Sequence, residues 1–119
     1  MDTRPKTIIC DIDGTLIWHQ KPSVNSNLNH TGSLLPGTLE KLDEWERNGY
    51  NIILITGRKE SMRTKTELEL SKLGIYYDHL IMGVGGGTRY LINDTKLDGA
   101  ESAFAINIER NKGIQNINL

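Results

Sequence analysis

The sequence contains little cysteine, little net charge and no long apolar run. A single cysteine among 119 residues cannot close an internal disulfide. The net charge of −1 gives no support for a nucleic-acid or membrane-surface partner. No apolar run approaches the roughly 20 residues that span a bilayer, and residues 1–6 lack the apolar core of a signal peptide. We therefore expect one cytoplasmic domain over residues 1–119, without a membrane partner.

Short apolar runs alternate with stretches of helical periodicity, which predicts an α/β fold. Strands are expected at residues 7–10, 51–55, 79–82 and 90–92, with a further edge strand open at 103–108. The first run is apolar throughout, which is typical of a strand buried on both faces. We therefore expect one three-layer α/β/α, Rossmann-like domain whose mainly parallel sheet has helices on both faces.

Two helices are expected between these strands. One begins at Pro36-Gly37-Thr38 and ends near residue 48, with Leu39, Leu42 and Trp45 on its inner face. The other runs from about residue 59 to 73, and its Lys and Glu residues are interpreted as a solvated face. Its inner face consists of Met62, Thr66, Leu70 and Leu73. Residues 18–35 are polar and predict a loop or small flap.

Asp11 and Asp13 stand directly after the first apolar run, separated by one residue and followed by a Gly-Thr turn. Two carboxylates so close repel each other unless a cation or a shared proton compensates. The pair therefore indicates a metal site, an acid–base pair, or both. An Asp can act as a nucleophile that forms an aspartyl-phosphate, and a second Asp can pass a proton to a leaving oxygen.

Polar segments follow three of the predicted strands, at the point where each ends. They are Asp11-Ile12-Asp13-Gly14-Thr15, Thr56-Gly57-Arg58, and the stretch from Asn93-Asp94 to Asp98. In a parallel sheet the carboxyl ends of the strands lie at one edge, where α/β proteins bind their ligands. We expect the three segments to converge there.

These segments resemble the motifs of the haloacid dehalogenase-like superfamily of phosphohydrolases. Residues 11–15 match its first motif, Asp-x-Asp-Gly-Thr, in full, Thr56 matches the second, and Asp94 with Asp98 matches the fourth. The resemblance implies that Asp11 attacks phosphorus and that Asp13 transfers the proton. It also implies that Thr56, with Gly57, binds a phosphoryl oxygen. Magnesium would be held by Asp11, Asp94 and Asp13 through its backbone carbonyl.

The third motif, a Lys or Arg before the late acidic strand, departs from the superfamily pattern. Its region reads Met82-Gly83-Val84-Gly85-Gly86-Gly87-Thr88-Arg89, without the usual Gly-Lys-Pro. Arg89 is the best candidate because an arginine can hold a phosphate through two hydrogen bonds. Arg58, Lys72 and Lys96 remain open for this role. Asn93 and Asp98 are expected beside the metal site, Asp98 through a bound water.

Other interpretations of these motifs are weaker. A calcium loop would need Asn or Asp where Thr15 stands and a Glu at loop position twelve, and both are missing. The glycine run 83–87 is not a dinucleotide fingerprint because a strand, not a helix, is expected after it.

The spacing of the motifs leaves no room for a cap, either in residues 16–35 or between Thr56 and Arg89. The resemblance therefore implies a small capless phosphatase, whose open site favours a homo-oligomer, either a dimer or a tetramer. The leading function is Mg²⁺-dependent hydrolysis of a small sugar phosphate. The alternatives are a nucleotide or polynucleotide 3′-phosphatase, although the charge makes nucleic acid unlikely, and a non-catalytic binding module.

Overall fold

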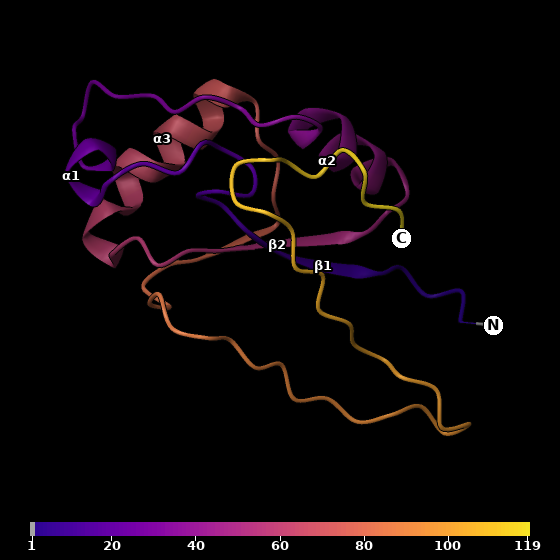
Figure 1. The fold of residues 1–119 in the computed structure, drawn as a ribbon. Coiled ribbons are helices and arrows are strands. Elements are labelled where there is room, and N and C mark those ends of the chain that lie inside the picture. Colours follow the sequence, from indigo (N-terminus) through magenta and orange to yellow (C-terminus); the bar gives the residue numbers. More distant parts are fainter. Residues whose placement is uncertain (1) are drawn as a thin grey trace.

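Three short parallel strands form the sheet around which the chain is arranged (Figure 1). The computed structural model describes residues 2–119. The strands are β1 (Thr7–Asp11), β2 (Asn51–Ile55) and β3 (His79–Ile81), in the order β1-β2-β3. Each coincides closely with a predicted apolar run, since Ile and Leu side chains suit a half-buried pleated surface. The predicted α/β class with a parallel sheet and no cap is confirmed.

The two expected helices are present, and one short helix adds to them. Helix α2 (Thr38–Arg47) buries Leu42 and Trp45, whereas the predicted inner residue Leu39 is 37% exposed. A 3₁₀ turn, η1 (Glu60–Met62), leads into α3 (Arg63–Leu73), which ends at Gly74 in the left-handed conformation that a glycine adopts readily. Helix α1 (Pro22–Asn25) is a single turn inside the expected flap.

Helices α2 and α3 lie on the same face of the sheet (Figure 1). Both crossovers step in the same direction along the order β1-β2-β3, and right-handed crossovers of that kind place both helices on one side. Residues 2–119 therefore build no second helical layer, although the sequence predicted three layers. The exposure of the strands agrees, because Cys10, Leu54 and Leu80 are buried in register whereas Ile9 and Ile81 are each 47% exposed. The expectation that the first strand is buried on both faces was wrong.

Residues 83–108 form an extended arm that leaves the sheet and returns to it (Figure 1). The predicted strands at 90–92 and 103–108 are both absent from the described residues, so these predictions were wrong. The arm bonds mainly to itself, as where Asn93 Nδ2 donates to Ser102 Oγ at 2.7 Å. At its tip Lys96 Nζ donates to Asp2 Oδ2 at 2.7 Å. A short apolar run carries no information about which strand it joins, and here neither run pairs with β1.

The C-terminal segment (residues 109–117) returns to the helical side of the molecule. Ile114 is 1% exposed in a core it shares with Ile12, Leu16, Leu42 and Trp45. This segment had no predicted structure, yet it completes the core. None of the helices in residues 2–119 is long and apolar enough to cross a membrane.

Candidate active site

A tight turn follows β1 and holds the two predicted catalytic carboxylates. The backbone N–H groups of Thr15 and Leu16 donate to the Ile12 carbonyl at 3.1 and 2.8 Å, and Gly14 N–H donates to the Ile17 carbonyl at 2.7 Å. Gly14 has φ +86°, a conformation that L side chains rarely adopt. Ile12 is fully buried and turns inward, while Asp11 and Asp13 on either side remain partly exposed. The geometry thus explains the Asp-x-Asp-Gly order.

Asp13 is bound by Arg58, which follows β2. Arg58 Nε donates to Asp13 Oδ2 at 2.9 Å and Nη2 donates to Oδ1 at 2.8 Å, so the pair is bidentate. Arg58 is one of the three residues, besides Arg89, that the sequence left open for the third-motif role. In the structure its guanidinium binds the Asp13 carboxylate. Asp13 therefore accepts a hydrogen bond from Arg58 on each of its carboxylate oxygens.

Arg58 is held from the opposite side by a buried cluster on α3. Arg58 Nη1 donates to Glu69 Oε1 at 2.8 Å, and Lys65 Nζ donates to the same oxygen at 2.8 Å. Glu69 Oε2 accepts the backbone N–H of Gly32 in the flap at 2.7 Å. Lys65 and Glu69 are 8% and 2% exposed, so the interpretation of this helix's charges as a solvated face was wrong for these two.

The ionisation of this cluster follows from its contacts. Burial alone lowers the pKa of Arg58, but the hydrogen bonds and charges of Asp13 and Glu69 outweigh it, so this pKa lies above its usual value. Burial alone raises the pKa of Glu69, but the donors Lys65, Arg58 and Gly32 outweigh it, so this pKa lies below its usual value. The cluster is therefore a network of charged groups.

Arg89 reaches Asp11 across a glycine-rich loop. Its Nη1 lies 3.3 Å from Asp11 Oδ1. The loop is fixed to the end of β2, because Val84 N–H donates to the Thr56 carbonyl at 3.1 Å and Gly83 N–H donates to the Arg58 carbonyl at 2.7 Å. Gly57 permits this approach, since a Cβ there would lie 3.2 Å from the Gly85 carbonyl oxygen. Thr56 is 1% exposed, and its Oγ1 accepts the Arg58 backbone N–H at 3.0 Å.

The late acidic residues do not join this group. Asp94 and Asn93 lie on the arm, where Ser102 donates to the Asp94 carbonyl. The arm's tip, which carries Lys96 and Asp98, bonds to Asp2, before the start of β1 and so at the opposite end of the strand from Asp11. The three residues expected to bind Mg²⁺ are thus not brought together, because Asp94 lies away from Asp11 and Asp13. Residues 2–119 contain no group of three His, Cys, Asp or Glu placed to hold a metal. Of the expected ligands, Asp11 and Asp13 stand together on the turn after β1, and Asp94 does not join them.

Comparison with known families decides what this site belongs to. Residues 5–89, more than half of the chain, match the family model described as the polynucleotide kinase PNKP phosphatase domain. The match includes Asp11, Asp13, Thr56, Arg58 and Arg89. The chain belongs to this family. The matched residues therefore form a phosphatase domain of the haloacid dehalogenase-like type.

Solved structures place the PNKP-type phosphatase domain among proteins of similar fold. A chain in the structure titled "Pnkp1/Rnl/Hen1 complex" is 31% identical with a TM-score of 0.58, over 72% of this chain and 30% of that chain. A chain in "the Pnkp1/Rnl/Hen1 RNA repair complex" is 33% identical with a TM-score of 0.56, over 66% and 25%. This chain thus spans less than a third of either relative.

A Vibrio cholerae protein shares the fold, with 23% identity and a TM-score of 0.52 over 74% of this chain and 79% of that one. No curated protein sequence matches the chain.

Sequence reasoning missed two contributors to the phosphatase site. The first is the buried pair Lys65 and Glu69, whose i, i+4 spacing does not distinguish it from an exposed ion pair on a helix. The second is the C-terminal segment, where Asn111 N–H donates to the Gly14 carbonyl at 2.8 Å. No local sequence pattern predicts this contact, because its partners are far apart in the sequence. The remaining basic candidate, Lys72, is exposed in the last turn of α3.

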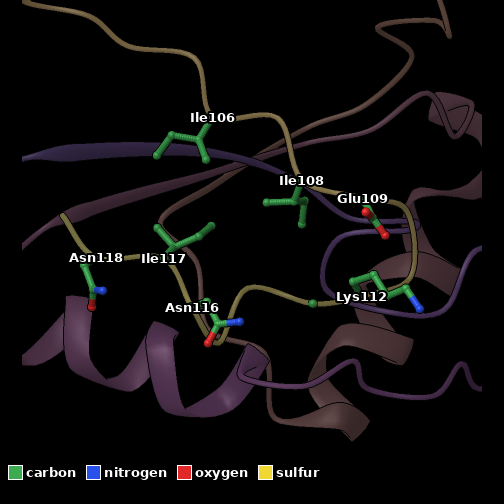
Figure 2. Close-up of a pocket in the computed structure, with 8 residues that line it drawn as sticks. Ile106, Ile108, Glu109, Lys112, Asn116, Ile117 and Asn118 are labelled. Carbon is green, nitrogen blue, oxygen red and sulfur yellow. The ribbon is translucent and has the colours of Figure 1, made fainter.

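One hollow in the surface lies away from these residues (Figure 2). It measures about 440 Å³ and lies between the returning arm and the C-terminal segment. Its lining includes the apolar Ile106, Ile108 and Ile117 and one charge of each sign, Glu109 and Lys112. None of the predicted site residues contributes, so the hollow is not a phosphate site. Cys10 lies beside Asp11, but burial, with a smaller effect of Asp11, raises the pKa of its thiol to about 12, so it does not serve as a nucleophile.

Proposed function

We propose that the domain hydrolyses phosphomonoesters through an aspartyl-phosphate on Asp11. The observation that carries the proposal is the family match together with Asp11 and Asp13 on one tight turn at the end of β1. An Asp11 carboxylate oxygen attacks phosphorus, and the bond between phosphorus and the ester oxygen breaks. Water then attacks the aspartyl-phosphate, which releases inorganic phosphate and restores Asp11.

Asp13 handles the proton in both halves of this reaction. It gives a proton to the leaving alcohol in the first half and takes one from the attacking water in the second, so the two transfers balance. The bidentate contact with Arg58 fixes the orientation of the Asp13 carboxylate for both transfers. In the first half, Asp13 carries the proton and one of these hydrogen bonds gives way.

Arg89, Thr56 and Gly57 bind the phosphoryl group in this proposal. Arg89 is within 3.3 Å of Asp11, so a phosphate attacked by Asp11 lies within its reach. A guanidinium there offsets the charge that develops on the phosphoryl oxygens. Thr56 and Gly57 follow Ile55, which pairs with Asp11 in the sheet, so both stand beside Asp11 at the end of the adjacent strand.

We also propose that activity requires Mg²⁺, on the strength of the superfamily resemblance. Oxygen ligands such as the Asp11 carboxylate and the Asp13 carbonyl suit this ion. A third protein ligand is needed in addition to these two, and Asp94 is the residue that the superfamily motif assigns.

The substrate we favour is a phosphorylated nucleotide or polynucleotide end. The matched family is described as the polynucleotide kinase PNKP phosphatase domain, and two relatives sit in Pnkp1/Rnl/Hen1 complexes, one of them titled an RNA repair complex. The capless fold leaves the Asp11 edge open, which suits a large substrate. A small sugar phosphate is the second candidate, favoured by the net charge of −1. Polynucleotide turnover should weaken steeply with salt, whereas turnover of a small phosphate should not.

The test is phosphate release from a panel that includes a 3′-phosphorylated oligonucleotide, a nucleotide and a sugar phosphate, with Mg²⁺ or with EDTA. We expect Mg²⁺-dependent turnover that Asp11→Asn lowers by at least about 10³-fold, since the nucleophile is lost. Asp43→Asn, an exposed carboxylate on α2, is the matched control and should retain activity. Equal turnover by the wild type and Asp11→Asn would contradict the mechanism.

A further inference from the structure

Asn111 connects the C-terminal segment to the turn that follows Asp11 and Asp13. Its backbone N–H donates to the Gly14 carbonyl at 2.8 Å, and its Oδ1 accepts the His19 backbone N–H at 2.7 Å. One residue, 92 positions from His19, thus bridges both ends of residues 14–19. The turn's own hydrogen bonds involve Ile12 and Ile17, so Asn111 adds a constraint that the turn does not provide itself.

The backbone of Asn111 is itself unusual. Its φ of +65° makes it the single non-glycine residue with positive φ among residues 2–119. Asn adopts this conformation more readily than most residues, but it still costs free energy, and such strain concentrates at functional sites. The neighbouring Arg110 packs its side chain on Gly14, where a Cβ would lie 3.1 Å from Arg110 Cγ. The Asn111 backbone and the Arg110 side chain therefore both contact the turn at Gly14.

The segment that carries Asn111 is also anchored to the core and to the start of α2. Ile114 is 1% exposed, and its backbone N–H donates to the Pro36 carbonyl at 3.0 Å. The C-terminal segment passes very close to the start of α2, and glycines make this possible. A Cβ on Gly113 would lie 2.2 Å from the Pro36 oxygen, and a Cβ on Gly37 would lie 2.4 Å from Gln115 Cα. Asn111 is thus held between the catalytic turn and the start of α2, with little freedom to move.

We propose that Asn111 is a positioning residue of the phosphatase. By holding residues 14–19 it keeps Asp11 and Asp13, which enter the same turn, at the orientation needed for attack and proton transfer. The C-terminal segment, which lies outside the matched residues 5–89, is then part of the active site. The inference rests on the proposed function. Displacing a reacting group by about 1 Å can cost roughly 10²-fold in rate, so a hydrogen bond that fixes the turn has a measurable effect.

Two variants separate the side chain of Asn111 from its backbone. Asn111→Gly keeps the backbone donor and tolerates positive φ but lacks the acceptor for His19. Asn111→Asp keeps an acceptor oxygen in the same place. On the best substrate of the panel, we expect Asn111→Gly to lower kcat by about 10- to 100-fold with little change in KM, and Asn111→Asp to restore most of it. Asn116→Gly, an exposed position in the same segment, is the matched control.

Hydrogen exchange at the His19 amide gives a second readout that needs no activity. We expect faster exchange in Asn111→Gly, and wild-type exchange in Asn111→Asp and Asn116→Gly. Unchanged exchange in Asn111→Gly, or wild-type kcat despite faster exchange, would overturn the inference. A wild-type protein that releases no phosphate overturns the proposed function, whereas an active wild type with an equally active Asn111→Gly overturns the positioning role alone.

Discussion

Arg58 connects the proposed proton-transfer residue to the interior of the domain. Two of its nitrogens bind Asp13, and Nη1 binds Glu69 on α3. A lysine could not replace it, because an ammonium is a point charge that lacks the fixed fork needed for a bidentate carboxylate. The orientation of Asp13 therefore depends on the Thr-Gly-Arg segment after β2 as well as on its own turn.

Glu69 predicts a specific dependence of stability on pH. Its pKa is lowered in the folded protein from a reference value of 4.5, so near that pH the folded state binds fewer protons than the unfolded state. Its stabilisation is complete above about pH 4.5 and is lost as the pH falls through the folded pKa. We expect Glu69→Gln to cost roughly 3–5 kcal/mol at pH 7, because it leaves Arg58 and Lys65 undercompensated.

Urea unfolding of the wild type and Glu69→Gln between pH 7 and pH 3 measures this. The difference in free energy of unfolding should narrow as the pH falls, because only the wild type loses the Glu69 charge. Glu67→Gln, exposed on the same helix, should stay within about 0.5 kcal/mol throughout. A gap that stays constant down to pH 3 would show that the Glu69 charge is not what stabilises the cluster.

The same residues show how far single-residue reasoning reaches. The turn that holds Asp11 and Asp13 was predictable because its requirements are local: an apolar strand, alternating acids and a glycine. The burial of Lys65 and Glu69 was not, because a charged pair with i, i+4 spacing looks the same on a solvated helix. Only Arg58, supplied from another element, makes their burial tolerable.

At the scale of elements, β1, β2, β3, α2 and α3 were predictable to within a few residues. Their apolar periodicity and their glycine stops are properties of contiguous sequence. The two strands predicted in the arm are absent from the residues that the structure describes. Pairing with β1 would be a long-range contact, and an apolar pattern over three to six residues does not predict such a contact. Without that pairing, Asp94 and Asp98 do not reach the edge of the sheet where Asp11 lies. The absence of the predicted strands therefore also explains why the predicted metal ligand Asp94 is not close to Asp11.

The C-terminal segment and the arm should differ sharply in their contribution to stability. Ile114 is 1% exposed, so Ile114→Ala removes buried methyl groups and leaves a cavity, which costs roughly 2–5 kcal/mol. Leu97 is fully exposed at the arm's tip, so Leu97→Ser should change the free energy of unfolding by less than about 0.5 kcal/mol. Urea unfolding at one protein concentration measures both.

The predictions for Ile114→Ala and Leu97→Ser can be contradicted independently of each other. A large loss of stability in Leu97→Ser would mean that the arm packs against the domain in solution. A negligible loss in Ile114→Ala would mean that residues 109–117 do not complete the core, and it would also weaken the basis for Asn111 as a positioning residue.

At the scale of the whole molecule, the helices cover one face of the sheet and leave the other largely bare. That face presents Ile9 and Ile81, and the arm carries exposed Tyr90, Ile92 and Phe104. Isolated exposed apolar residues are common, but a concentration of them on one side is typical of an interaction surface. The homo-oligomer expected from the capless site would also cover these residues.

Self-association through the arm can be measured directly. We expect light scattering to give a multiple of 13.4 kDa for the wild type, because burying exposed apolar surface contributes about 25 cal/mol per Å². Replacing both Ile92 and Phe104 by Ser should give the monomer mass, since these side chains are 91% and 75% exposed and are thus available to a second copy. Leu28→Ser, 79% exposed in the flap, is the matched control and should leave the mass unchanged. A wild type at 13.4 kDa across the accessible concentration range would remove the oligomer and leave the Asp11 edge open to a large substrate.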